Sequence, residues 1–218
     1  MKDEINTVKE ILEDLINRYP VLSTSKDDIY RAFIILKDSY ENHHKLLIAG
    51  NGGSAADAEH IVGELMKGFN KKRAVPFAFA EELVKLDDLR GKNLMAKLQG
   101  ALPAIALNNH SALNSAYLND VDGLLCYSQQ VYGYGELGDV LLAISTSGNS
   151  ENIINSVLVA KVKGIKTIGL TGKSGGELKK LVDVCIAVAE EETYKIQELH
   201  LPIYHALCLM LEEFFFAK

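Results

Sequence analysis

The chain has 218 residues, enough for one α/β domain with added helices, and its 48% hydrophobic and 24% charged content is typical of a folded globular protein. These values exclude a largely disordered chain. A formal net charge of -6 gives no overall attraction to nucleic acid or to an anionic membrane surface, so neither is an expected partner.

The cysteines and the N-terminal segment bear on the cellular compartment. Cys126, Cys185 and Cys208 are far apart, odd in number and set among apolar neighbours, which favours reduced thiols in a core. The first residues are acidic, and no run of apolar residues approaches the roughly 18 that a membrane helix needs. We therefore expect a cytoplasmic protein without a membrane anchor.

Helices and short apolar runs alternate along the chain. Helical spacing of apolar residues over 5–43, broken at Tyr19-Pro20, predicts two N-terminal helices within residues 1–44. Five apolar runs follow and are predicted to be buried strands, at 46–49, 104–107, 140–144, 167–170 and 184–188. Continuous apolar strands separated by helices predict a doubly wound α/β fold with a five-stranded parallel sheet, and we expect residues 1–218 to form a single domain.

Two further segments stand out. Residues 71–100 are rich in charge, and we expect an inserted flap with one helix near 80–98. The last helix is predicted from about Tyr194 to Phe216, with a wide apolar face and Pro202 inside it, where proline removes a hydrogen bond.

Two loops rich in glycine and hydroxyl groups follow predicted strands. The first begins "GNGGSAADAEHIVGE" at Gly50, and the second is "STSGNSENI", starting at Ser145. Backbone amides and the positive end of a helix dipole converge at such strand ends, which suits a phosphate. Each loop alone is also compatible with an ordinary turn and helix cap by Ser54 or Ser150. Neither loop has the spacing of a nucleotide-binding motif.

Four polar side chains have helical spacing. His60 and Glu64 are four residues apart, and Gln197 and His205 are eight apart, so each pair lies on one side of its helix. Imidazole, carboxylate and amide groups suit a divalent ion such as Zn²⁺, whereas carboxylate and imidazole alone suit proton transfer. The alternatives are a surface ion pair for His60–Glu64 and a buried core histidine for His205, with His200 as its nearest competitor.

The combined motifs resemble a known family. "AGNGGSAADAEHIVGEL", "DVLLAISTSGNSENI", "GLTGKSGGEL" and "IQELHLPIYH" are similar, in order and interval, to the sugar isomerase (SIS) domain and, within it, to the phosphoheptose isomerases. The resemblance covers the chain outside residues 71–100. It implies a flavodoxin-like SIS fold and a cytoplasmic homotetramer that converts sedoheptulose 7-phosphate to D-glycero-D-manno-heptose 7-phosphate, with one metal ion per site, usually zinc.

The resemblance also implies roles for individual residues. Glu64 resembles the general base, and His205 resembles the acid that moves protons between the two enediol oxygens. The implied metal ligands are His60, Glu64, Gln197 and His205. The implied substrate-binding residues are Asn51, Gly52, Gly53, Ser54, Asn119, Asp120, Ser145, Thr146, Ser147, Ser150 and Gln197.

Two other functions fit the same motifs. One is a non-catalytic SIS protein that senses a sugar phosphate or associates with a replication initiator; such relatives lack the base and the acid, so Glu64 and His205 favour an enzyme. The other is an isomerase of a different sugar phosphate, with residues 71–100 setting specificity.

Overall fold

The computed structural model describes residues 2–217, with side chains from residue 6 onward. A single five-stranded sheet has the order β2-β1-β3-β4-β5, and all four neighbouring pairs are parallel. This confirms the predicted fold class. The strands are β1 (Leu46–Gly50), β2 (Ala104–Ala106), β3 (Val140–Ile144), β4 (Lys166–Thr171) and β5 (Val184–Ala187).

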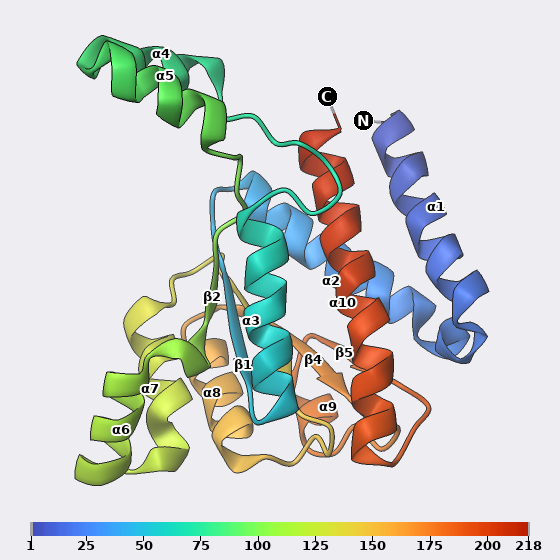
Figure 1. Cartoon of the computed structure of the whole chain (residues 1–218). Helices are drawn as coiled ribbons and strands as arrows, with labels where there is room; N and C mark the ends of the chain where they lie inside the picture. The colour runs from blue at the N-terminus through green and yellow to red at the C-terminus, as the bar shows by residue number, and fades with distance from the viewer. Residues whose placement is uncertain (1, 218) are drawn as a thin grey trace.

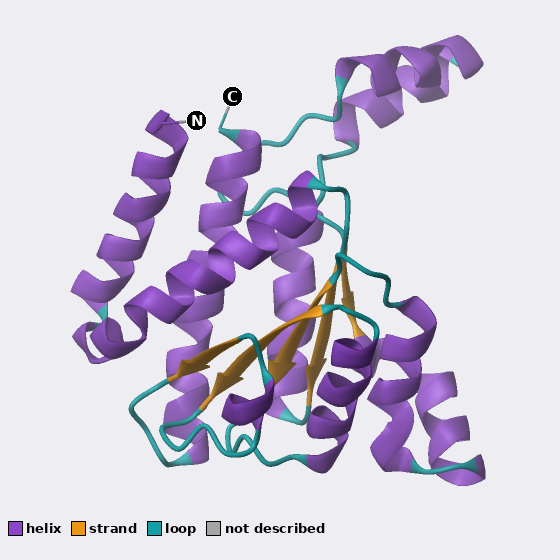
Figure 2. Cartoon of the chain, turned by 180° about the vertical axis from the view of Figure 1, so that it is seen from behind, coloured by secondary structure: helices purple, strands orange, loops and turns teal. Residues whose placement is uncertain are grey.

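Helices cover both faces of the sheet (Figures 1 and 2). Successive strand residues point to opposite faces, so Leu46 and Ile48 belong to one apolar core while Leu47 and Ala49 belong to the other. The first core is closed by α1 (Lys2–Arg18), α2 (Lys26–Glu41), α3 (Gly53–Met66) and α10 (Thr193–Phe216). The second is closed by α7 (Cys126–Tyr134), α8 (Glu151–Val162) and α9 (Leu178–Leu181).

The N-terminal helices form where the apolar spacing predicted them. Between α1 and α2 the chain turns through a short 3-10 helix, η1 (Pro20–Ser25), because Pro20 cannot continue α1 but is accepted at the first position of a helix. The remaining short elements, between β2 and α7, are η2 (Leu107–Asn109), α6 (Ser111–Asp120) and η3 (Gly123–Leu125).

The last helix, α10, packs between α1, α2 and α3. Within residues 2–217 it is the one helix that is long and apolar enough to cross a membrane, judged by length and composition alone. However, 56% of its most apolar 18-residue window is buried inside the fold. We therefore assign α10 as a core helix of this α/β domain.

Residues 71–100, predicted to be a flap with one helix, contain two helices, so the prediction of one was wrong. Asp87 ends α4 (Phe77–Leu86), and its side chain accepts a hydrogen bond from the Arg90 backbone amide to start α5 (Asp88–Lys97). Gly91 lets α5 approach α4, because a Cβ there would collide with the Leu83 carbonyl. The α4–α5 hairpin projects away from the body of the molecule (Figures 1 and 2).

The base of this hairpin is closed by the backbone. Gly100 donates its amide hydrogen to the Arg73 carbonyl at 2.9 Å, and Ala74 and Gln99 form an antiparallel bridge. Leu102 then donates to the Leu65 carbonyl at 3.0 Å, which returns the chain to the body before β2 begins. The hairpin is therefore attached through one narrow stem.

Candidate active site

The two glycine–serine loops meet at one edge of the sheet. The chain runs from β1 outward to β2 and then returns to β3 on the other side of β1, so the carboxyl ends of β1 and β3 form the switch point where open α/β sheets bind ligands. Their register pairs Gly50 with Ile144, directly before the loops. A cavity of about 290 Å³ lies there, lined by Asn51, Gly52, Gly53, Ser54, Ile144, Ser145, Thr146, Ser150, Thr193 and Gln197.

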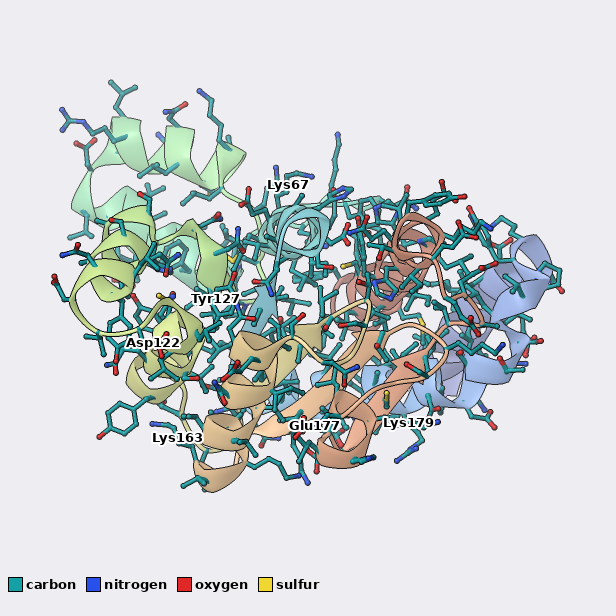
Figure 3. All side chains as sticks on the ribbon, turned by 90° about the horizontal axis from the view of Figure 1, so that it is seen from below. Lys67, Asp122, Tyr127, Lys163, Glu177 and Lys179 are labelled. Atoms are coloured by element: carbon teal, nitrogen blue, oxygen red, sulfur yellow. The ribbon has the colours of Figure 1, made fainter. Side chains whose placement is uncertain are left out.

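The first loop needs its glycines. Gly52 has φ +54°, a conformation that side chains with a Cβ rarely adopt, and it is the residue that caps α3. A Cβ at Gly50 would collide with the Ser54 backbone, and one at Gly53 would collide with the Gln197 amide. Tyr127 of α7, labelled in Figure 3, donates its hydroxyl to the Gly50 carbonyl at 2.6 Å and so supports the loop.

Side-chain hydrogen bonds join the two loops. The amides of Asn51 and Asn152 bond each other reciprocally, at 2.9 and 2.8 Å. The Ser145 and Ser150 hydroxyl oxygens lie 3.0 Å apart. Ser150 stands at the N-cap of α8 but makes no side-chain cap bond, and the cap of α3 is Gly52, not Ser54. The Ser150 hydroxyl is therefore not used as a helix cap, and it lines the cavity together with Ser145.

A second hollow of about 570 Å³ adjoins the second loop. Thr146 lines both spaces, while Ser147 lines only the larger one. Asn149 of the second loop also lines it, and its remaining walls come from the loops after β4 and β5 and the start of α10, at Gly172, Lys173, Ser174, Glu190, Glu191 and Ile196. The two hollows therefore share Thr146 as a common wall.

The predicted acid–base residues gather between α3 and α10, which pack side by side (Figure 1). His60 Nε2 lies 3.2 Å from Glu64 Oε1, and the Glu64 side chain is only 11% exposed. The ring of His205 meets that of His60 edge-on, with centroids 4.9 Å apart. Lys67 Nζ lies 3.4 Å from the other Glu64 oxygen. The structure thus brings three of the four predicted side chains into one cluster.

The environment of His205 favours its neutral form. Burial lowers the pKa of the imidazole, and nearby His60 adds to that effect, while Glu64 opposes it. Its Nε2 atom is buried and has no hydrogen-bond partner within the described residues. A neutral imidazole can both accept and donate a proton, which suits transfer between two oxygens.

His200 does not share this cluster. It is fully buried more than one turn earlier in α10, and burial lowers the pKa of its ring to about 4. It is therefore neutral at physiological pH. Despite Pro202 inside α10, His205 is the histidine that faces His60.

Two residues of the cluster escaped the sequence reasoning. The Tyr204 hydroxyl lies 3.0 Å from His60 Nδ1 and donates to Asp57 Oδ1 at 3.2 Å. This fixes the His60 ring from the side opposite Glu64. Asp57 is three residues before His60 on α3, a helical spacing that could have drawn attention to it, but Tyr204 reaches His60 only through the packing of α10 on α3.

The fourth predicted metal ligand lies elsewhere. Gln197 lines the phosphate-sized cavity next to Gly53, away from the histidine cluster. Among residues 2–217 no group of three His, Cys, Asp or Glu side chains is arranged to hold a metal ion. As placed, the four residues do not close around zinc, so zinc stays a prediction.

Asn119 and Asp120 lie apart from both loops. They end α6, are exposed, and hydrogen-bond each other at 2.7 Å. Neither lines the cavity between the loops. Their predicted contact with substrate is thus not formed within one copy of the chain and stays a prediction.

A parallel sheet with two polar loops at its switch point, and a carboxylate and imidazoles further along α3 and α10, is the arrangement of an α/β enzyme that binds a phosphorylated substrate. A family model described as "SIS domain" matches residues 89–172, a range that begins inside α5. Phosphoheptose isomerase from a Nitratiruptor species is 39% identical over 207 residues, covering 95% of this chain and 97% of that one.

Solved structures agree. A phosphoheptose isomerase from Francisella tularensis is 30% identical with a TM-score of 0.73, covering 96% of each chain. Phosphoheptose isomerase from Neisseria gonorrhoeae is 28% identical with a TM-score of 0.69, covering 97% of this chain and 94% of that chain. The chain belongs to the phosphoheptose isomerase family.

Proposed function

We propose that the chain interconverts sedoheptulose 7-phosphate and D-glycero-D-manno-heptose 7-phosphate through an enediol. Relatives named phosphoheptose isomerase align over nearly the whole chain. The observation that carries the proposal is that Glu64 and His205 both lie against His60, on helices whose N-terminal turns line the cavity between the two loops.

The proton transfers follow from the two side chains. Glu64 as a carboxylate removes the proton from the carbon next to the carbonyl and returns it to the adjacent carbon. His205, whose partial burial favours the neutral imidazole by lowering its pKa, gives a proton to the carbonyl oxygen and takes one from the neighbouring hydroxyl. His60, with Nε2 3.2 Å from a Glu64 oxygen and Nδ1 3.0 Å from the Tyr204 hydroxyl, lies against the carboxylate and limits its orientation.

The length of helix α3 sets the distance between the proposed phosphate-binding loops and the proposed acid–base residues. Ser54 is in its first turn and Glu64 is ten residues later, a rise of about 15 Å at 1.5 Å per residue. The substrate lies along this helix, with its phosphate in the loops and its carbonyl end toward the Glu64 and His205 side chains. Binding energy from the remote phosphate then positions the reacting carbons.

We also infer a cytoplasmic homotetramer with one zinc ion per site. Support comes from the motif resemblance, and the exposed position of Asn119 and Asp120 is compatible with a site completed by another copy. Sedimentation of the purified protein tests the tetramer. Elemental analysis, with activity before and after chelation, tests the metal.

The activity itself is tested by conversion of sedoheptulose 7-phosphate with the purified chain and with Glu64→Gln and His205→Ala. We expect turnover by the parent and loss of about 100-fold or more in each variant, because each removes one proton carrier. Val162→Ala, an exposed change on α8, serves as control. Binding of the sugar phosphate without turnover would contradict the proposal and direct the assay to other ketose and aldose phosphates.

A further inference from the structure

A buried ion pair lies behind the acid–base cluster. Arg73, in the segment between α3 and the hairpin, and Glu212, near the end of α10, are 2% and 1% exposed. Arg73 Nε donates to Glu212 Oε1 at 2.8 Å. A buried charge pair persists only when its remaining polar atoms are also satisfied, so their other partners show what the pair holds.

The Arg73 guanidinium holds the end of α3. Its Nη1 donates to the Leu65 carbonyl at 2.8 Å and its Nη2 to the Glu64 carbonyl at 3.0 Å. These belong to the last turn of α3, whose carbonyls have no partner within the helix. The ring of Phe216 covers the guanidinium, 4.7 Å from its central carbon. One planar group therefore fixes the backbone of the proposed base itself.

The Glu212 carboxylate holds the chain that leaves α3. It accepts hydrogen bonds from the backbone amides of Phe69 and Asn70 at 2.8 Å each, and of Lys71 at 3.2 Å. Glu212 is seven residues after His205, two turns along α10, and so lies on the same side of that helix. Phe69, held in this way, contacts the His205 ring with centroids 5.4 Å apart.

We infer that Arg73 and Glu212 are positioning residues of the isomerase: as one clamp they set the spacing and register of α3 against α10, and thereby the placement of Glu64 relative to His205. The inference rests on the proposed function for its catalytic meaning. The inferred placement of α3 against α10 does not depend on which substrate the protein binds.

Another buried carboxylate, far from the acid–base cluster, provides a control for the structural effect of changing Glu212. Asp139 is also a fully buried carboxylate, with Lys45 Nζ at 2.7 Å and the Glu136 amide at 2.8 Å. It lies immediately before β3, at the edge of the sheet opposite the two loops. Asp139→Asn and Glu212→Gln therefore make the same chemical change in equally buried sites, but only Glu212 lies behind the cluster.

The experiment measures kcat, KM and unfolding for Glu212→Gln, Asp139→Asn and Arg73→Lys. Lysine keeps the positive charge of Arg73 but lacks the planar group that reaches Glu212 and both carbonyls. Arg73→Lys therefore tests the hydrogen-bond geometry separately from the charge. It also replaces Glu212→Gln as the test if that variant does not fold. We expect kcat to fall about 100-fold in Glu212→Gln and Arg73→Lys with KM within about twofold, because the phosphate cavity lies at the other end of α3. Asp139→Asn keeps the parental kcat.

A second measurement needs no turnover. The nuclear Overhauser effect between the His60 and His205 rings reports their contact directly, and we expect it to weaken in Glu212→Gln and Arg73→Lys but not in Asp139→Asn. An unchanged ring contact in these two variants overturns the inference, as does an equal loss of kcat in Asp139→Asn. A parent without turnover but with the expected ring changes counts against the proposed function alone.

Discussion

The end of α3 and the α4–α5 hairpin are neighbours in sequence but are stabilised in opposite ways. At the end of α3, the Arg73–Glu212 pair is buried and joins residues 139 positions apart in the chain. The ion pairs of the hairpin are local and exposed, such as Arg90–Asp87, whose side chains are 84% and 40% exposed. Long-range contacts therefore define the site, whereas local ones define the hairpin.

The largest expected difference is in stability. Arg73→Met leaves the buried Glu212 charge without its partner, and we expect the free energy of unfolding to fall by about 3–5 kcal/mol. Arg90→Met removes an exposed ion pair, and we expect the free energy of unfolding to change by less than about 1 kcal/mol. Urea unfolding of both variants measures the two values. Equal losses would show that the hairpin is integrated into the fold as deeply as the clamp.

A glycine comparison gives a smaller effect on function. Gly148, in the second loop, has φ +67°, and a Cβ there would collide with the Gly175 carbonyl. We expect Gly148→Ala to destabilise the native conformation of this loop by about 1–2 kcal/mol. A loss of that size is expected to raise KM about 5- to 30-fold. Gly91→Ala in the hairpin forces α5 away from α4 but leaves KM and kcat at parental values. Steady-state kinetics with matched circular dichroism spectra separate the two. A parental KM in Gly148→Ala would argue against phosphate binding by this loop.

The sequence predicts elements stabilised by local contacts better than features held by long-range contacts. The five strands are readable because each is a short apolar run, and α10 because its apolar residues repeat at helical spacing. The break between α4 and α5 escapes the pattern because Asp87 caps a helix inside a continuous helical spacing. Local signals thus predict elements well, and err mainly where two helices follow each other directly.

The site is predictable only in part. Its loops and the His60–Glu64 pair carry local motifs: the two loops meet at one cavity, and His60 lies next to Glu64 one turn along α3. Tyr204 and the Arg73–Glu212 clamp depend on how α10 packs against α3, which no local spacing encodes. Gln197 has the expected spacing from His205, but eight residues separate the two along the helix axis by about 12 Å, so Gln197 reaches the loop cavity.

The smallest expected effect comes from removing the hairpin. Ala74 and Gln99 already pair across its stem, so replacing residues 75–98 by an Asn-Gly turn joins two strand-like ends without moving either. We expect kcat and KM for sedoheptulose 7-phosphate to stay within about twofold of the parent, because the clamp and both loops lie outside the deletion.

The deletion also removes a set of exposed apolar side chains, Phe77, Phe79, Leu86, Leu89, Leu94, Met95 and Leu98, so we expect less aggregation on concentration. Light scattering checks this, and a panel of sugar phosphates checks specificity. If the deletion changes KM for this sugar while a different sugar phosphate becomes the better substrate, the hairpin takes part in substrate selection. In that case the α4–α5 hairpin, although it is stabilised by local contacts and attached through one stem, affects the active site from a distance. The contrast between a hairpin defined by local contacts and a site defined by long-range contacts would then be wrong.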